Sequence, residues 1–141
     1  MIIEIRRHGD WDRKTGGLTS KSKKEAERIS ESNTYDKVFS TLPLRCLQTA
    51  EILGKQEPII IGREFDDIKQ REDVGERINK MFQSIIRQGS AKRRILIISH
   101  SNFIAAIEYF LGEKEIPQNL DDLPVIPYLK GIQINISKQK L

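Results

Sequence analysis

The two histidines of this 141-residue sequence are the side chains best suited to carry chemistry near neutral pH. His8 comes soon after the short apolar run 2–5, and His100 follows the apolar run 95–98 after a single serine. An imidazole can act as a nucleophile or carry a proton. One histidine alone is more often a structural side chain, but two that both follow strand-like runs indicate a shared site.

Two arginines stand beside these histidines in the sequence or in the expected fold. Arg7 directly precedes His8, and Arg45 lies in the polar turn that follows the strand candidate 37–40. A guanidinium group has a planar fork of donors that matches the oxygens of a phosphate. We therefore expect Arg7, His8, Arg45 and His100 to converge on an anion, although they are far apart along the chain.

Strand-like runs alternate with helical patterns along the chain. Strands are predicted at 2–5, 37–40, 59–61 and 95–98, and an alternating, half-exposed edge strand at 132–136. Such alternation predicts an α/β fold, a three-layer α/β/α sandwich with a mostly parallel central sheet. Ligands of such sheets bind outside the carboxyl ends of the strands, where both histidines would lie.

Four helices are expected between these strands. Ser22 and Glu25 have the spacing of a capping box and predict the first helix, and the others are predicted from Pro43 to Gly54, from Val74 to Gly89 and over 103–111. The last of these is apolar nearly all round, which predicts a well-buried helix. The acid-rich stretch 63–73 has no clear pattern.

Composition limits the remaining choices. The net charge is only +4, from 24 basic and 20 acidic residues, and aromatic residues make up 6% of the chain. Such a mild excess is typical of a solvated surface and does not favour nucleic-acid binding. The single cysteine, Cys46, excludes an internal disulfide, and the apolar runs are too short to span a membrane. With no signal-like N-terminus, a cytoplasmic protein is expected.

Four segments form an ordered set of motifs across nearly the whole chain. They resemble the motifs of the histidine phosphatase superfamily, which contains phosphoglycerate mutase-like enzymes and acid phosphatases. Arg7-His8-Gly9 resembles its RHG signature, Leu18-Thr19 with Glu25-Ala26 its LTxxGxxQA stretch, residues 40–50 its SxLxRxxQTA helix entry, and Ser99-His100-Ser101-Asn102 its SHGN motif.

The resemblance implies a phosphatase that works through a phosphohistidine intermediate. His8 would be the nucleophile and must be neutral to attack, and His100 would donate to the phosphoryl group. The phosphate-binding residues implied are Arg7, Gly9, Arg45, Ser101 and Asn102. No metal or other cofactor is required in this scheme.

The family also uses a carboxylic acid after the third strand to protonate the leaving oxygen. Glu64 occupies that place in the segment Arg63-Glu64-Phe65 and is our candidate for the general acid and base. Asp66 and Asp67 are close rivals and Asp10 is a more distant one, so the assignment stays open.

The sequence departs from the family at the loop DWDRKTGG after RHG, and Ser22 and Ser101 stand where glycines are usual. The short interval from Arg45 to His100 predicts a single domain over 1–141 without a large cap. An open site fits a phosphatase better than a mutase, which must exclude water. The small size resembles the compact branch with phosphohistidine phosphatases, so the substrate would be a phosphorylated small molecule or a phosphoprotein. Oligomeric state is left open.

The residues also allow other interpretations. A phosphoglycerate mutase-type phosphotransferase and a non-catalytic phosphate-binding regulatory module both remain as alternatives. Asp10 to Thr15 resembles the DxDx[TV] motif of haloacid-dehalogenase phosphatases, but it misses the motif by one position, and Asp10 does not directly end the apolar strand. Cys46 has isoleucine at position 52 where a cysteine-phosphatase loop needs arginine.

Overall fold

The computed structural model describes residues 1–61, 74–88 and 93–136, and its centre is a single five-stranded sheet. The strands are β1 (Ile2–Arg7), β2 (Lys37–Ser40), β3 (Ile59–Ile60), β4 (Arg94–Ser99) and β5 (Gly131–Asn135). They are arranged in the order β3-β2-β4-β1-β5. The first four are parallel, and β5 pairs antiparallel with β1 at the edge. The predicted α/β fold with a mostly parallel sheet is confirmed.

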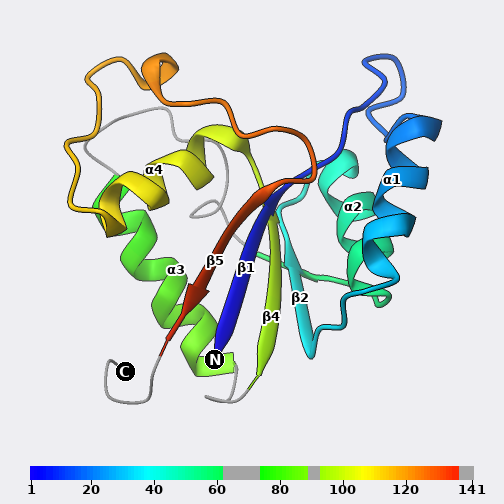
Figure 1. Cartoon of the computed structure of the whole chain (residues 1–141), viewed down its shortest axis with the longest axis horizontal. Coiled ribbons are helices and arrows are strands. Elements are labelled where there is room, and N and C mark those ends of the chain that lie inside the picture. The colour runs from blue at the N-terminus through cyan, green and yellow to red at the C-terminus, as the bar shows by residue number, and fades with distance from the viewer. Residues whose placement is uncertain (62–73, 89–92, 137–141) are drawn as a thin grey trace.

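Helices cover both faces of the sheet, which makes the three layers predicted from the sequence. On one face lie α1 (Ser20–Ser30) and α2 (Leu44–Gly54), and on the other lie α3 (Val74–Gln88) and α4 (Ser101–Leu111) (Figure 1). The long segment between α4 and β5 arches over the carboxyl ends of β1 and β4. It includes a short 3-10 helix, η3 (Leu120–Asp122).

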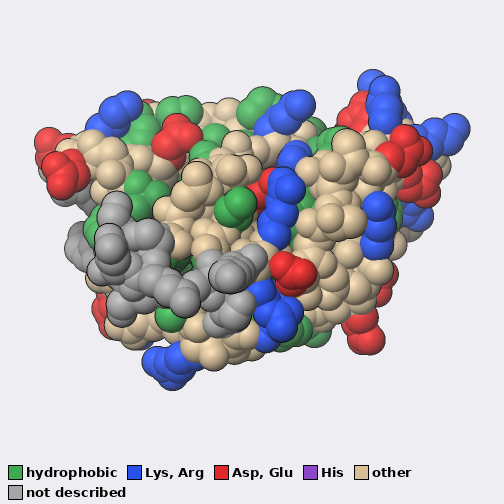
Figure 2. All heavy atoms as spheres, turned by 60° about the horizontal axis from the view of Figure 1, so that its bottom comes forward, with side chains coloured by type: hydrophobic (Ala, Val, Ile, Leu, Met, Phe, Trp, Pro, Cys, Tyr) green, Lys and Arg blue, Asp and Glu red, His purple; other side chains and the backbone are tan. Residues whose placement is uncertain are grey.

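The surface carries both kinds of charge. Figure 2 shows Lys and Arg side chains and Asp and Glu side chains spread over the same face, with no histidine in view. This mixed distribution agrees with the small net charge of +4. Among the described residues, no helix combines the length and apolar character needed to cross a lipid bilayer.

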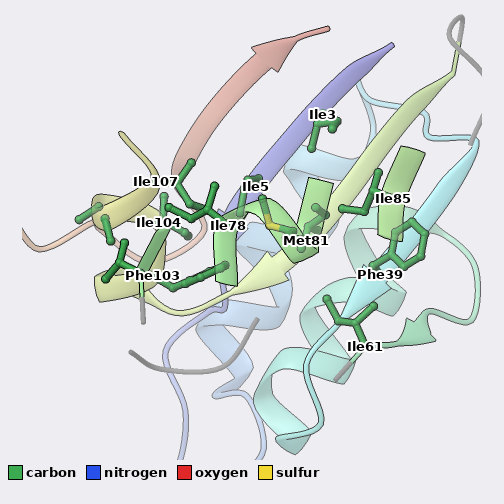
Figure 3. Close-up of a cluster of buried hydrophobic side chains, with 14 of the residues drawn as sticks. Ile3, Ile5, Phe39, Ile61, Ile78, Met81, Ile85, Phe103, Ile104 and Ile107 are labelled. Atoms are coloured by element: carbon green, nitrogen blue, oxygen red, sulfur yellow. The ribbon is translucent and has the colours of Figure 1, made fainter. Parts of the chain in front are cut away.

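The most apolar strand, β4, is buried on both of its faces. Ile95 and Ile97 face the core between the sheet and α3 and α4, while Leu96 and Ile98 face α1 and α2. Successive side chains of a strand point to opposite faces, so a central strand must be apolar throughout. Figure 3 shows the larger of the two cores, with residues Ile3, Ile5, Phe39, Ile61, Ile78, Met81, Ile85, Phe103, Ile104 and Ile107.

The start of α1 differs from the prediction. Its N-cap is Thr19, whose hydroxyl accepts a hydrogen bond of 3.1 Å from the backbone N–H of Ser22. Ser22 is therefore a buried residue within the helix and not the cap of a capping box. Thr19 and Ser22 both have a side-chain oxygen suited to capping, and the local sequence does not distinguish them.

The ends of α2 and α4 also differ from the prediction. Pro43 is the N-cap of α2, not part of its first turn, and Gly54 is its last residue. A Cβ on Gly54 would lie 2.3 Å from Val38 of β2, so the glycine permits close packing on the sheet. The helix α4 begins at Ser101, and its last turn is exposed at Phe110 and Leu111, by 39% and 47%.

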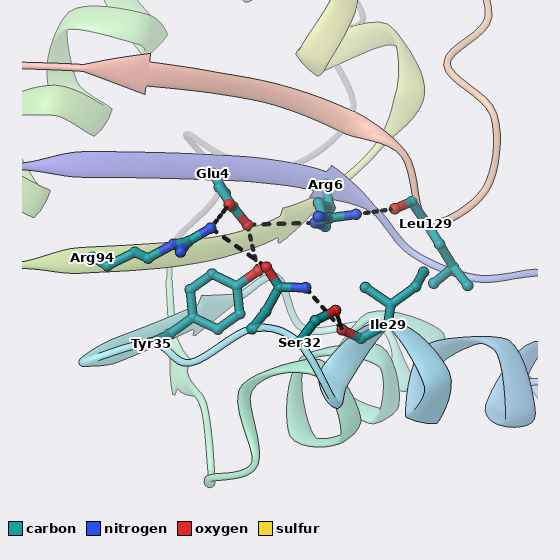
Figure 4. Close-up of polar contacts among 8 residues, drawn as sticks. Glu4, Arg6, Ile29, Ser32, Tyr35, Arg94 and Leu129 are labelled. Carbon is teal, nitrogen blue, oxygen red and sulfur yellow. Dashed lines mark hydrogen bonds and ion pairs between the residues drawn. The ribbon is translucent and has the colours of Figure 1, made fainter.

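A buried polar network ties β1 to the α1 and α2 side of the sheet (Figure 4). The Glu4 carboxylate accepts a hydrogen bond from Tyr35 and forms ion pairs with Arg94 and, at 3.6 Å, with Arg6. Burial raises the pKa of Glu4, but the bonds from Tyr35 and Arg94 and the nearby positive charges outweigh it, so the pKa is lowered. Burial and the contact with Glu4 raise the pKa of Tyr35 to about 12.

Candidate active site

The sheet brings the two histidines together. Arg7 of β1 is paired with Ser99 of the adjacent parallel strand β4, so the residues that follow them, His8 and His100, lie side by side. Their ring centroids are 5.5 Å apart and the ring planes are inclined by 70°. The side chains are nearly buried, with exposed fractions of 4% and 5%. The strands thus place both rings at the carboxyl edge, as the sequence predicts.

The His8 ring has a defined orientation. Its Nδ1 atom lies 2.8 Å from the carbonyl oxygen of Gly9. A carbonyl oxygen can only accept a hydrogen bond, so Nδ1 carries the proton and Nε2 carries the lone pair in the neutral ring. The Nε–H of Arg45 lies 3.4 Å from this Nε2 atom. This N–H donates to Nε2, so the lone pair of His8 accepts a hydrogen bond from Arg45.

His8 is held in its neutral form. Burial lowers its pKa to about 4, and the positive charges of His100, Arg45 and Arg7 act in the same direction, against the smaller effect of the Gly9 hydrogen bond. A buried imidazole surrounded by cationic groups gains little from a further positive charge. At neutral pH the ring is thus a free base, the state in which a histidine can attack an electrophile.

Gly9 has a packing role next to this ring. Its backbone N–H donates to Thr49 Oγ1 of α2 at 3.1 Å, and a Cβ on Gly9 would lie 2.1 Å from the Ser22 hydroxyl of α1. Thr49 in turn donates to the carbonyl of Arg45 at 2.7 Å. Gly9 is expected at the phosphate site, but its N–H is engaged with Thr49 and it is not among the residues that line the pocket.

The two predicted arginines are fixed by different partners. Arg7 donates from Nη1 to the carbonyl of Ile126 at 2.9 Å, and its Cζ atom lies 4.0 Å from the ring centre of Tyr128. Its buried Nε has no hydrogen-bond partner among the described residues, and thus offers one donor to a ligand. Arg45 lies with its Cζ atom 4.2 Å from the ring centre of Trp11.

These side chains line a pocket of about 400 Å³. Six residues predicted for the site lie in its wall: Arg7, His8, Arg45, His100, Ser101 and Asn102. The other lining residues were not assigned from the sequence: Trp11, Arg13, Leu120, Asp121, Leu123, Pro124, Val125 and Tyr128. They come from the loop after β1 and from the segment between α4 and β5.

The amino end of α4 opens onto this pocket. His100 is the N-cap, and Ser101 and Asn102 form the first turn, whose backbone N–H groups and helix dipole favour an anion. The Ser101 hydroxyl oxygen accepts a 2.7 Å hydrogen bond from the backbone of Ile126. On the other side, His100 Nε2 lies 3.4 Å from the hydroxyl of Thr41. These two contacts hold Ser101 and His100 against the neighbouring segments that contain Ile126 and Thr41.

Among the residues that the structure describes, no carboxylate considered as a proton donor from the sequence lies in the pocket wall. Glu64, Asp66 and Asp67 lie outside the described residues. Asp10 is exposed, accepts a 2.9 Å hydrogen bond from the backbone of Trp11, and does not line the pocket. Within the described part of the chain, the carboxylate that does line it is that of Asp121 in η3, which no sequence motif marked.

One group of side chains in the described part of the chain can reach a common metal ion. His8, Cys46 and His100 have potential ligand atoms within 4.8 Å of one another. Arg7 and Arg45 line the same pocket, and their fixed positive charges oppose the entry of a cation. Four cationic or donor side chains and a helix N-terminus fit an anion such as phosphate better.

Comparison with known proteins gives structural neighbours only. No protein-family model and no curated protein matches the sequence. A phosphoserine phosphatase of Entamoeba histolytica in complex with 3-phosphoglyceric acid has a TM-score of 0.70 at 16% identity, and 99% of each chain is covered. The Bacillus stearothermophilus protein YhfR has a TM-score of 0.76 at 18% identity, with 97% of this chain and 92% of that chain covered.

A third neighbour is a mycobacterial glucosyl-3-phosphoglycerate phosphatase, with a TM-score of 0.67 at 15% identity and 94% and 88% of the two chains covered. These neighbours have the fold of the histidine phosphatase superfamily. The chain therefore has a phosphoglycerate mutase-like fold, as its motifs led us to expect.

Proposed function

We propose that this chain is a metal-independent histidine phosphatase that hydrolyses phosphate monoesters or protein-bound phosphohistidine through a phosphohistidine intermediate on His8. One observation carries the proposal. A buried, neutral His8 keeps its lone pair on Nε2, where it accepts a 3.4 Å hydrogen bond from Arg45, and His8 lines one pocket with Arg7, Arg45 and His100. The motif resemblance and the phosphatases among the structural neighbours support the same chemistry.

The proposed reaction has two steps. His8 Nε2 forms a bond to phosphorus while the ester P–O bond breaks, and the leaving oxygen takes a proton from a carboxylic acid, for which we propose Glu64. The resulting carboxylate then removes a proton from water. This water attacks phosphorus, the P–N bond breaks, and inorganic phosphate leaves with His8 neutral again.

The other side chains would stabilise the transferring group. Arg7 and Arg45 neutralise the charge on the phosphoryl oxygens, and His100 donates a further hydrogen bond. Ser101 and Asn102 would add donors from the first turn of α4. Because the Gly9 N–H is taken by Thr49, we propose that Gly9 serves the site by packing and not by binding phosphate.

Hydrolysis is proposed over transfer because we expect a single domain over 1–141 with no large cap to exclude water. The high coverage of the neighbouring chains supports this organisation. The substrate would be a phosphorylated small molecule or a phosphoprotein. The Entamoeba histolytica phosphoserine phosphatase, solved with 3-phosphoglyceric acid and, as a mutant, with phosphoserine, supports the small-molecule choice. The lone Cys46 agrees with action in the reducing cytoplasm.

A panel assay tests the proposal. The purified protein is incubated in EDTA with an aryl phosphate, phosphoserine, phosphoglycerates, sugar phosphates, a phosphoserine peptide and a phosphohistidine peptide. We expect release of inorganic phosphate with at least one of them. Binding of phosphate without any turnover would instead indicate the non-catalytic module. Activity that EDTA abolishes would contradict metal independence.

A further inference from the structure

Each of the two phosphate-binding arginines lies against an aromatic ring supplied by a loop. Arg7 lies 4.0 Å from the ring centre of Tyr128, and Arg45 lies 4.2 Å from that of Trp11. All four side chains line the same pocket. We propose that Trp11 and Tyr128 are positioning residues that hold these guanidinium groups ready for phosphate. The inference rests on the proposed function and explains the loop that departs from the family pattern.

The loop after β1 holds Trp11 firmly. Trp11 forms an antiparallel bridge with Leu18, and the Leu18 N–H donates to the Gln48 side chain of α2 at 2.7 Å. Arg13 donates to the backbone carbonyl of Trp11 at 2.6 Å, and its Cζ atom lies 3.9 Å from the centre of the same ring. The indole is thus anchored to the helix that carries Arg45.

The segment between α4 and β5 holds Tyr128 in a similar way. The Leu129 N–H donates to the Arg7 carbonyl at 3.1 Å, and the Arg7 N–H donates to the Lys130 carbonyl at 2.8 Å. Arg6 adds a side-chain bond of 2.9 Å to the Leu129 carbonyl (Figure 4). Leu129 itself is buried and has a left-handed φ of 64°. Backbone hydrogen bonds of the residues that follow Tyr128 therefore hold this segment against β1, the strand that carries Arg7.

These contacts prepare both arginines for an anion. A guanidinium that stacks on a ring is attracted by the ring face, and the more so where water is excluded. A long side chain that is already ordered loses less conformational freedom when phosphate binds. Tyr128 also lies near the proposed nucleophile, with its ring centre 6.0 Å from that of His8. The two rings thus support the site from two separate loops.

Substitution of each ring tests the proposal. In Trp11→Leu and in Tyr128→Leu we expect inorganic phosphate to bind about 5- to 20-fold more weakly, with a rise in KM that exceeds the fall in kcat. Trp11→Phe and Tyr128→Phe should recover most of the lost affinity, because a ring face remains. Tyr109→Leu is the matched control. The Lys114 Nζ atom lies 5.4 Å from the ring centre of Tyr109, and neither residue lines the pocket. This variant should bind phosphate as tightly as the parent.

Trp11 is the only tryptophan of the chain, so its fluorescence reports on this contact directly. Phosphate should change the emission saturably, with the dissociation constant that calorimetry gives. Leucine variants that bind phosphate as tightly as the parent would overturn the inference, and so would phenylalanine variants as weak as the leucine ones. A parent protein that neither binds nor releases phosphate would overturn the proposed function as well, and this result separates the two failures.

Discussion

The Nδ1 atom of His8 lies 2.8 Å from the carbonyl oxygen of Gly9, the next residue in the chain. This contact assigns the ring proton to Nδ1 and leaves the lone pair on Nε2, to which the Nε–H of Arg45 donates at 3.4 Å. It sets the tautomer that the proposed attack by Nε2 of His8 requires. Gly9 has to be a glycine because α1 packs against it, so the same residue fixes the ring and the helix.

The low pKa of His8 predicts an acid-sensitive fold. Its value of about 4 in the folded chain lies below the ordinary value of 6.5. Between these values the unfolded chain binds a proton that the folded chain does not, so the free energy of unfolding falls as the pH drops from 6.5 to 4. The loss attributable to His8 is ~3 kcal/mol.

Urea unfolding at neutral pH and near pH 4 measures this effect in the parent and in His8→Gln, whose side chain does not titrate. The variant should lose less stability between the two conditions than the parent does. An identical loss in both proteins would contradict the assignment of a buried, neutral His8.

Gly9→Ala should damage both stability and turnover. The new Cβ would lie 2.1 Å from the Ser22 hydroxyl and 3.1 Å from Leu18, so the buried Ser22 side chain must rotate or α1 must move. We expect a loss of about 1–3 kcal/mol in the free energy of unfolding, measured by urea denaturation. Ser22→Ala removes the closest atom and should restore part of the loss.

Gly75→Ala is the matched control for this substitution. Gly75 is the second residue of α3, and a Cβ there would make an ordinary contact of 3.5 Å with Phe110 of α4. This variant should be neutral or slightly more stable, since alanine favours the helix. If Gly9→Ala changes the free energy of unfolding no more than Gly75→Ala does, the claim that Gly9 is closely packed is wrong.

The buried Glu4 network predicts that the conservative substitution Glu4→Gln destabilises the fold. Glu4→Gln removes the charge that Arg94 and Arg6 share in a buried position, and should lower the free energy of unfolding by about 1–3 kcal/mol. Glu76→Gln is the matched control, because its pair with Lys80 at 3.1 Å is exposed on α3. It should cost about 0.5 kcal/mol or less. Equal losses in urea denaturation would contradict a stabilising role for the buried network.

The identity of the proton donor can be tested with substrates whose leaving groups differ in their need for a proton. If Glu64 is the general acid, Glu64→Gln should lower kcat/KM steeply for alkyl phosphates and mildly for activated aryl phosphates, which leave without a proton. Asp121→Asn tests the carboxylate that the structure places in the pocket wall. A steep leaving-group dependence in Asp121→Asn but not in Glu64→Gln would transfer the role to Asp121.

Much of the arrangement of strands and helices could be predicted from the sequence, because it follows from the periodicity of apolar residues. The continuous run Ile95 to Ile98 must be a strand buried on both faces, and a parallel pairing with 2–5 then brings His8 and His100 to one edge. Arg45 could be added through its motif. These predictions rest on spacing within short segments, which the fold preserves.

The rest depends on contacts between distant segments. Trp11 and Tyr128 lie in loops without periodicity, and only the folded chain brings them against Arg45 and Arg7. The role of Gly9 depends on where the Ser22 side chain lies after α1 has packed. Asp121 likewise enters the pocket through the path of a long irregular segment. No local pattern encodes such tertiary contacts.

The central claim is that His8 takes the phosphoryl group on Nε2. A rapid alkaline quench of the enzyme with a labelled aryl phosphate, followed by peptide mapping and NMR of the phosphorylated histidine, tests it most directly. The account predicts acid-labile label on Nε2 of His8, and a fall in turnover of at least ~1,000-fold in a folded His8→Ala variant. Label on Nδ1, label on Asp10 or Asp12, or undiminished turnover in His8→Ala would contradict it.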